Sequence, residues 1–70
     1  MYEYKFRVND DAELQQFETI MVDTVGATRF NTEGWTEAYG GTGVIVWVEC
    51  SWPKRDIKQI IECFEAVSFI

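Results

Sequence analysis

The stretch of sequence that decides the fold is residues 44–50, Val44-Ile45-Val46-Trp47-Val48-Glu49-Cys50. Its β-branched and aromatic residues favour a strand, and it is apolar on both faces until Glu49. This pattern is typical of a strand in the middle of a sheet, where each face is covered. Because successive side chains point to opposite faces, we expect the three valines to pack under helices, with Ile45 and Trp47 on an open face.

Two amphipathic elements precede this strand. Aromatic and β-branched residues alternate with charged residues over positions 2–8, which predicts a half-buried strand. Apolar residues then recur at steps of three and four, which predicts a helix over residues 11–25. Asp10 and Glu13 have the spacing of a capping box at the start of this helix, and Gly26 suits the left-handed position after its end.

The segment between the helix and residues 44–50 predicts a hairpin. Arg29 and Phe30 favour a strand, residues 31–34 have the composition of a turn, and residues 35–39 are a candidate short strand. The glycine-rich residues 40–43 predict the hairpin turn, because glycine adopts positive φ without a steric penalty. A phosphate-binding loop would instead lead into a helix and carry a lysine.

A second helix is expected to open at Trp52-Pro53 and to end near Glu65, and residues 66–70 are expected to form a short last strand. The order is then β-α-β-β-α-β, which predicts an α+β protein of the ferredoxin-like, split βαβ type. Two right-handed crossovers would place both helices on one face of an antiparallel sheet. If residues 66–70 stay irregular, the fold reduces to β-α-β-β-α. Since no linker or repeat interrupts residues 1–70, we expect a single compact domain.

Composition excludes several classes of function. The chain of 70 residues carries twelve Asp or Glu against six Lys or Arg, a formal net charge of −6, and no histidine. A negative protein is poorly suited to neutralise nucleic-acid phosphates or anionic lipid. Without histidine there is no Ser–His or Cys–His nucleophile pair, and the commonest metal ligand is missing. We therefore expect no enzymatic activity, no cofactor and no metal.

The cysteines and the apolar runs indicate the compartment. Two cysteines, Cys50 and Cys63, are too few for the disulfide framework of a secreted mini-protein. The longest apolar run, residues 44–48, is far shorter than the roughly 20 residues of a membrane helix. The first residues also lack the continuous apolar stretch of a signal peptide. We expect a cytoplasmic protein with Cys63 as a buried thiol, although a redox pair remains open if Cys50 lies under the second helix.

The acidic residues are unevenly distributed. Eight of them fall in residues 9–28 and 30–50, which contain no Lys or Arg, so the first helix and the hairpin are acidic. Such charge serves solubility in most proteins, but carboxylates can also imitate nucleic-acid phosphates and occupy a basic groove of a partner. Trp47 is either an apolar anchor for a partner or covered by loop residues or Trp35. The candidate partner-binding residues are Asp11, Glu13, Glu18, Asp23, Glu33, Glu37, Trp35 and Trp47.

In size, acidity and lack of motifs the chain resembles phage or mobile-element proteins that block host nucleic-acid machinery, of which anti-CRISPR proteins are the clearest class. The resemblance implies a protein-binding inhibitor, a nucleic-acid mimic whose partner is a basic nucleic-acid-binding protein or complex. The alternative is a ferredoxin-like regulatory or small-ligand-binding domain that acts as a dimer, which the apolar strand at residues 44–50 and its open face favour.

Overall fold

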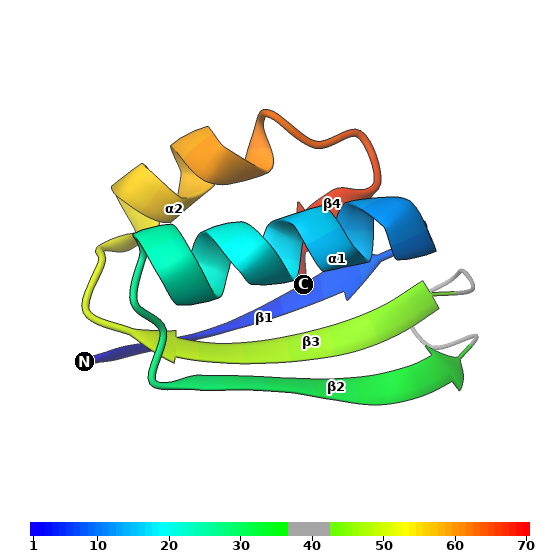
Figure 1. Ribbon diagram of the computed structural model, residues 1–70, viewed down its shortest axis with the longest axis horizontal. Coiled ribbons are helices and arrows are strands. Elements are labelled where there is room, and N and C mark those ends of the chain that lie inside the picture. Colours follow the sequence, from blue (N-terminus) through cyan, green and yellow to red (C-terminus); the bar gives the residue numbers. More distant parts are fainter. Residues whose placement is uncertain (37–42) are drawn as a thin grey trace.

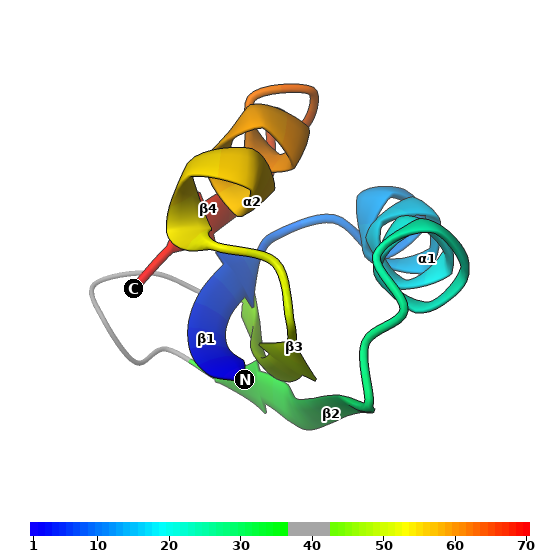
Figure 2. The ribbon, with the colours of Figure 1, turned by 90° about the vertical axis from the view of Figure 1, so that its left-hand side faces the viewer.

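Four antiparallel strands form one sheet, and both helices lie over the same face of it (Figures 1 and 2). The computed structural model describes residues 1–36 and 43–70. In chain order the elements are β1 (Tyr2–Val8), α1 (Asp11–Thr19), η1 (Ile20–Thr24), β2 (Arg29–Thr36), β3 (Gly43–Cys50), α2 (Lys54–Ile61) and β4 (Val67–Phe69). The predicted α+β class, with one antiparallel sheet and two helices, is confirmed.

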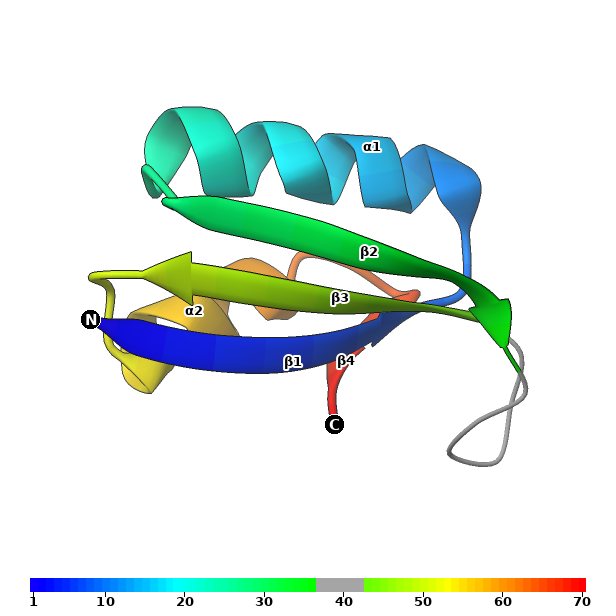
Figure 3. The same cartoon turned by 90° about the horizontal axis from the view of Figure 1, so that it is seen from below.

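The strand order is β2-β3-β1-β4, so the apolar strand β3 is central, as its pattern predicts. Figure 3 shows the sheet from the side away from the helices, with β3 between β1 and β2. The longest pairing joins β1 to β3, with Tyr2 opposite Cys50 at one end and Val8 opposite Val44 at the other. This register places the even-numbered residues of β1 and β3 on one face, under the helices.

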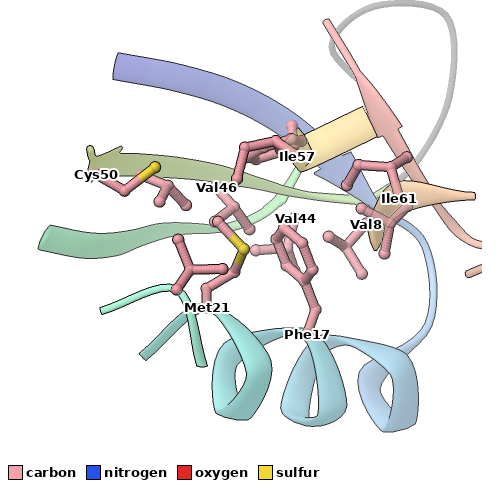
Figure 4. Packing of buried hydrophobic residues seen from close by; sticks show 12 residues of the cluster. Val8, Phe17, Met21, Val44, Val46, Cys50, Ile57 and Ile61 are labelled. Carbon is pink, nitrogen blue, oxygen red and sulfur yellow. The ribbon is translucent and has the colours of Figure 1, made fainter. Parts of the chain in front are cut away.

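That face forms the core (Figure 4). The three valines at positions 44, 46 and 48 are buried there, so the predicted orientation of β3 is confirmed. The helices contribute Phe17 and Met21 from the α1 side and Ile57 and Ile61 from α2. No polar or charged side chain is buried in the part of the chain that the structure describes. The fold is therefore stabilised mainly by apolar burial.

Phe17 is the residue on which this core is centred. It is fully buried, and its ring meets three other rings from different elements. The centroid distances are 5.1 Å to Phe6 of β1, 6.0 Å to Phe30 of β2 and 5.7 Å to Phe64, which follows α2. Rings at these distances and tilted orientations attract one another beyond their apolar burial, by about 0.5–1.5 kcal/mol a pair. One side chain of α1 thus joins two strands and the end of α2.

The first helix ends differently from the expectation. It was predicted to run as one α-helix over residues 11–25, but α1 stops at Thr19 and the chain continues through the π-helical turn η1. Here the Val25 N–H donates to the Ile20 carbonyl at 3.1 Å, five residues back. Gly26 then has φ 74°, the left-handed conformation predicted for it. No helix among the described residues is long and apolar enough to cross a membrane.

The prediction of a turn at residues 31–34 is wrong. These residues belong to β2, which runs from Arg29 to Thr36 with one irregularity. Thr32 pairs with Val46 and Trp35 with Val44, so Glu33 and Gly34 together stand opposite the single residue Ile45. This is a β-bulge, which accommodates one extra residue. Polar residues are tolerated here because β2 is an edge strand and residues 31–34 are exposed.

The second helix and the last strand are both shorter than expected. Pro53 is the N-cap of α2, and the helix ends at Ile61 and not near Glu65. The Cys63 and Phe64 N–H groups donate to carbonyls three residues back, so the chain leaves the helix through tight turns that bring Phe64 to Phe17. The last strand, expected over residues 66–70, comprises Val67–Phe69 and pairs with β1. The alternative without this strand is excluded.

The connection from β3 to α2 is fixed by a backbone carbonyl. The Trp52 carbonyl accepts a hydrogen bond from the Tyr4 hydroxyl at 2.7 Å, and the Cys50 thiol lies 3.9 Å from the same oxygen. Burial raises the pKa of Tyr4, and the nearby Cys50 thiol adds to the effect. The phenol therefore stays protonated and can donate this bond. Trp52 itself packs against the core, as expected for the start of α2.

Gly43 lies so close to β1 that a side chain would not fit there. Of the glycine-rich segment predicted as the hairpin turn, residues 40–42 lie outside the described part of the chain, whereas Gly43 is the first residue of β3. A Cβ atom on Gly43 would meet the Asn9 side chain at 2.9 Å, the Val8 carbonyl at 3.0 Å and the Arg7 stem at 3.1 Å. The close approach of β1 to β3 therefore leaves no room for a side chain at position 43.

The variant Gly43→Ala is expected to lower the free energy of unfolding by about 1–3 kcal/mol, as overpacking does. Gly34→Ala is the matched control, because a Cβ there meets no atom within 4 Å. It should stay within about 0.5 kcal/mol of the parent protein. Urea denaturation followed by tryptophan fluorescence measures both. Equal stability of the two variants would contradict the close approach.

Candidate functional site

Exposed carboxylates lie on the helical side of the molecule. On α1 and η1, Asp11, Glu18 and Asp23 are exposed, and none of them pairs with a Lys or Arg of the described residues. Glu62 and Glu65, which directly follow α2, are exposed as well. The acidic helical surface, as we name it, consists of Asp11, Glu18, Asp23, Glu62 and Glu65. Its first three members were predicted from the sequence, whereas the last two were not among the candidates.

Glu13 has a structural role. Its carboxylate is half-buried and accepts hydrogen bonds from the Glu65 N–H at 2.9 Å and the Ala66 N–H at 3.1 Å. The Asn9 N–H donates to the Ala66 carbonyl at 3.0 Å, so the start of α1 and the loop before β4 hold each other. Of the predicted capping box, only the Asp10 half forms, with its carboxylate accepting from the Ala12 N–H at 2.9 Å. Glu13 faces the loop before β4 because that loop offers two N–H groups.

The hairpin candidates are not gathered with the helical ones. Glu33 is exposed in the bulge of the edge strand β2, on the sheet and not on a helix. Trp35 lies in β2, but its side chain is outside the described part of the structure. Glu37 lies outside the described residues altogether. Glu33 therefore lies away from the acidic helical surface. The Trp35 side chain and Glu37 lie outside the described part of the structure.

Trp47 lies on the sheet face away from the helices. It is half-buried, and the Lys5 ammonium stands 4.6 Å from its ring centroid, within the range of a cation–π contact. A shallow depression of about 200 Å³ adjoins it, lined by Glu3, Arg29, Asn31, Trp47, Val48 and Glu49. Ile45, expected with Trp47 on an open face, is only 2% exposed, so that expectation is wrong at Ile45. Trp47 itself lies on the face of the sheet opposite to α1.

An apolar groove lies between α1 and the end of α2. Gln16, Thr19 and Ile20 line one side of it, and Cys63 and Phe64 line the other. Its volume is about 480 Å³, and most of its lining is apolar. We name these five residues the interhelical groove. No signal in the sequence indicated this groove, because the second helix was predicted to continue to Glu65, whereas α2 ends at Ile61 and leaves residues 63 and 64 outside the helix.

The two cysteines differ in accessibility. Cys50 is fully buried in the core, whereas Cys63 is exposed, so the prediction that Cys63 is a buried thiol is wrong. Both are free thiols. In the described ranges, no group of three or more Cys, Asp or Glu side chains is close enough to hold a metal ion. Cys63 belongs to the groove surface.

Comparisons with protein-family models, curated protein sequences and solved structures find no match for this chain. The function is therefore inferred from the surface alone. Two features stand out on the helical side of the sheet, the acidic helical surface and the interhelical groove. On the opposite side lies the depression beside Trp47.

The structural role of Glu13 can be tested by removing its charge. Glu13→Gln leaves one oxygen for two N–H donors, and it should lower the free energy of unfolding by about 1–3 kcal/mol, the range for an unsatisfied donor. Glu18→Gln removes the same charge from an exposed position of the same helix and should stay within about 0.5 kcal/mol of the parent. Thermal denaturation measures both. If the two variants unfold at the same temperature, Glu13 does not anchor the loop before β4.

Proposed function

We propose that this protein is a non-enzymatic, ferredoxin-like protein-binding module whose acidic helical surface occupies a basic, nucleic-acid-binding surface of another protein. The order β2-β3-β1-β4, with both helices over one face, supports the ferredoxin-like arrangement. A partner that binds nucleic acid presents clustered Lys and Arg side chains. By covering them, the module would act as an inhibitor of the type to which anti-CRISPR proteins belong.

The position of Asp23 is the observation that carries this proposal. It lies in η1, the last turn of a helix that is continuous from α1, and no basic residue accompanies it in either segment. The carboxyl end of a helix carries a partial negative charge, so a carboxylate there lowers stability while a cation would raise it. Asp11, in the first turn, lies where the helix dipole favours an acid. Helix stability therefore explains Asp11 but does not explain Asp23.

A partner rich in cations explains both Asp11 and Asp23. Unneutralised carboxylates that share one side of a protein produce a field that steers an oppositely charged partner and speeds its association. The described bases support this polarity. Lys54, Arg55 and Lys58 lie in the first five residues of α2, while Lys5, Arg7 and Arg29 lie on β1 and β2. The α1 side thus remains acidic.

The variants Asp11→Asn and Asp23→Asn separate binding from stability. Both remove one acidic charge, so both should weaken partner binding, most strongly at low salt. Their stabilities should move in opposite directions, with Asp11→Asn less stable and Asp23→Asn more stable by about 0.3–1 kcal/mol each. Binding is measured by capture of nucleic-acid-binding proteins from a cell lysate on immobilised protein, with displacement by duplex DNA. Stability is measured by urea denaturation.

Two results would contradict the proposal. Capture by both variants equal to that of the parent would show that the acids take no part in binding. Loss of capture by Asp11→Asn alone would show that binding follows stability and not charge. The substitution Gln15→Asn, at an exposed position of α1, serves as the uncharged control.

A second candidate function is favoured by the depression beside Trp47. It combines an aromatic ring with carboxylates from Glu3 and Glu49 and a guanidinium from Arg29. In the register of the sheet, Arg29 stands opposite Glu49, which stands opposite Glu3, so groups of both charges line one row. A regulatory domain could bind a small polar ligand or a second copy of itself on this face.

If this second function holds, the protein forms a dimer whose population rises with concentration, and Trp47→Ala weakens it. Light scattering over a range of concentrations measures the mass. Trp47→Ala should leave capture of basic proteins unchanged, because Trp47 lies on the face opposite the acidic helical surface. A monomer at all concentrations, for both parent and variant, would exclude the dimer.

A further inference from the structure

The interhelical groove has the form of a docking site for an extended apolar stripe. It is open to solvent and lies between α1 and the turn after α2. Ile20 and Phe64 are half-buried in it, so part of each apolar side chain still faces water. Small-molecule pockets usually enclose most of their ligand. An open groove of this kind suits an amphipathic helix, which covers it with one face.

The local backbone shapes this groove on both sides. On one side, α1 changes to the π-helical turn at Ile20, and such turns occur frequently at functional sites. On the other side, α2 ends at Ile61, and the chain turns so that Phe64 reaches Phe17 while Cys63 stays exposed. The groove therefore exists because Phe64 is drawn toward the core. It is part of the fold and needs no rearrangement of the described backbone.

The charges around the groove identify the chemistry of its occupant. Glu62 and Glu65 flank the groove residues 63 and 64 in the chain. Asp23 lies three residues beyond Ile20, about one turn along the same helix. All three carboxylates are exposed, so an occupant of the groove meets negative charge from η1 and from the turn after α2.

We propose that the interhelical groove binds a basic amphipathic helix of the partner, whose apolar stripe covers Ile20 and Phe64 and whose Lys or Arg side chains meet Asp23, Glu62 and Glu65. This inference rests on the proposed function and names the part of the partner that is bound. A second copy of this chain is a poor occupant, because its α1 and η1 carry acids and no base, and the apolar face of its basic helix α2 is packed in its own core. The groove would supply an apolar anchor on the helical side, whereas Trp47 lies on the opposite face.

The exposed thiol of Cys63 makes the proposal testable. Cys50 is fully buried, so an uncharged maleimide should alkylate Cys63 alone in the folded protein. The probe is a synthetic Lys/Leu peptide of about 18 residues, five helical turns, with its leucines on one face. At about ten times its dissociation constant it should slow alkylation about tenfold, since only the unbound fraction reacts. A peptide of the same composition, scrambled so that its leucines form no stripe, should leave the rate unchanged.

The variants Gln16→Lys and Gln15→Lys form a matched pair. Both put the same cation on α1, but Gln16 lines the groove and Gln15 does not. Gln16→Lys should abolish the protection of Cys63 by the Lys/Leu peptide, because the new ammonium repels it inside the groove. Gln15→Lys should retain it. Each variant is compared with itself with and without peptide, so any effect on the thiol itself cancels.

Four other results would each contradict the proposal, and each points to a different cause. Equal protection by both peptides would mean that binding is electrostatic and not directed to the groove, and it would leave the proposed function intact. Binding of neither peptide, measured by fluorescence anisotropy, would contradict the proposed function as well. Protection that rises with protein concentration, without any peptide, would mean that a second copy occupies the groove. Protection equal in Gln16→Lys and Gln15→Lys would place the peptide elsewhere.

Discussion

The contact of Phe17 with three other aromatic rings is the constraint from which the rest of the helical side follows. Phe6, Phe30 and Phe64 come from β1, β2 and the turn after α2, and they meet at one side chain of α1. To reach Phe17, Phe64 has to leave the axis of α2, so the helix ends at Ile61. The same turn leaves Cys63 exposed and opens the groove between the helices. The core therefore determines the surface feature that we propose to be functional.

The carboxylates of α1 and η1 divide into two kinds according to what faces them. Glu13 lies beside the loop before β4 and is held by two backbone N–H groups, so its position serves the fold. Asp11, Glu18 and Asp23 face solvent, and the described residues offer them no base. Only the second kind is available to a partner. A single helix can thus fix a loop with one acid and present others, because its turns place them on different sides.

Much of the fold could be predicted from periodicity, and the errors have local physical causes. Alternation predicted β1 and the central position of β3, because side chains on a strand alternate between faces. The bulge at Glu33 and Gly34 was taken for a turn, since an exposed edge strand needs no apolar pattern. The bonds of Glu13 join residues more than fifty positions apart, which no local pattern reveals. Helical spacing placed Cys63 beside the core only because it assumed that α2 continues.

The charge pattern is independent of what stabilises the fold. The core is apolar, no charged side chain is buried among the described residues, and the exposed pair Arg55–Asp56, at 4.0 Å, contributes little. Most carboxylates could therefore be exchanged for neutral residues with little effect on the core. Yet η1 keeps an acid at Asp23, where the helix dipole opposes it. A charge that lowers stability and contacts no base within the described structure does not serve the fold, and this is the basis on which we propose a cationic partner.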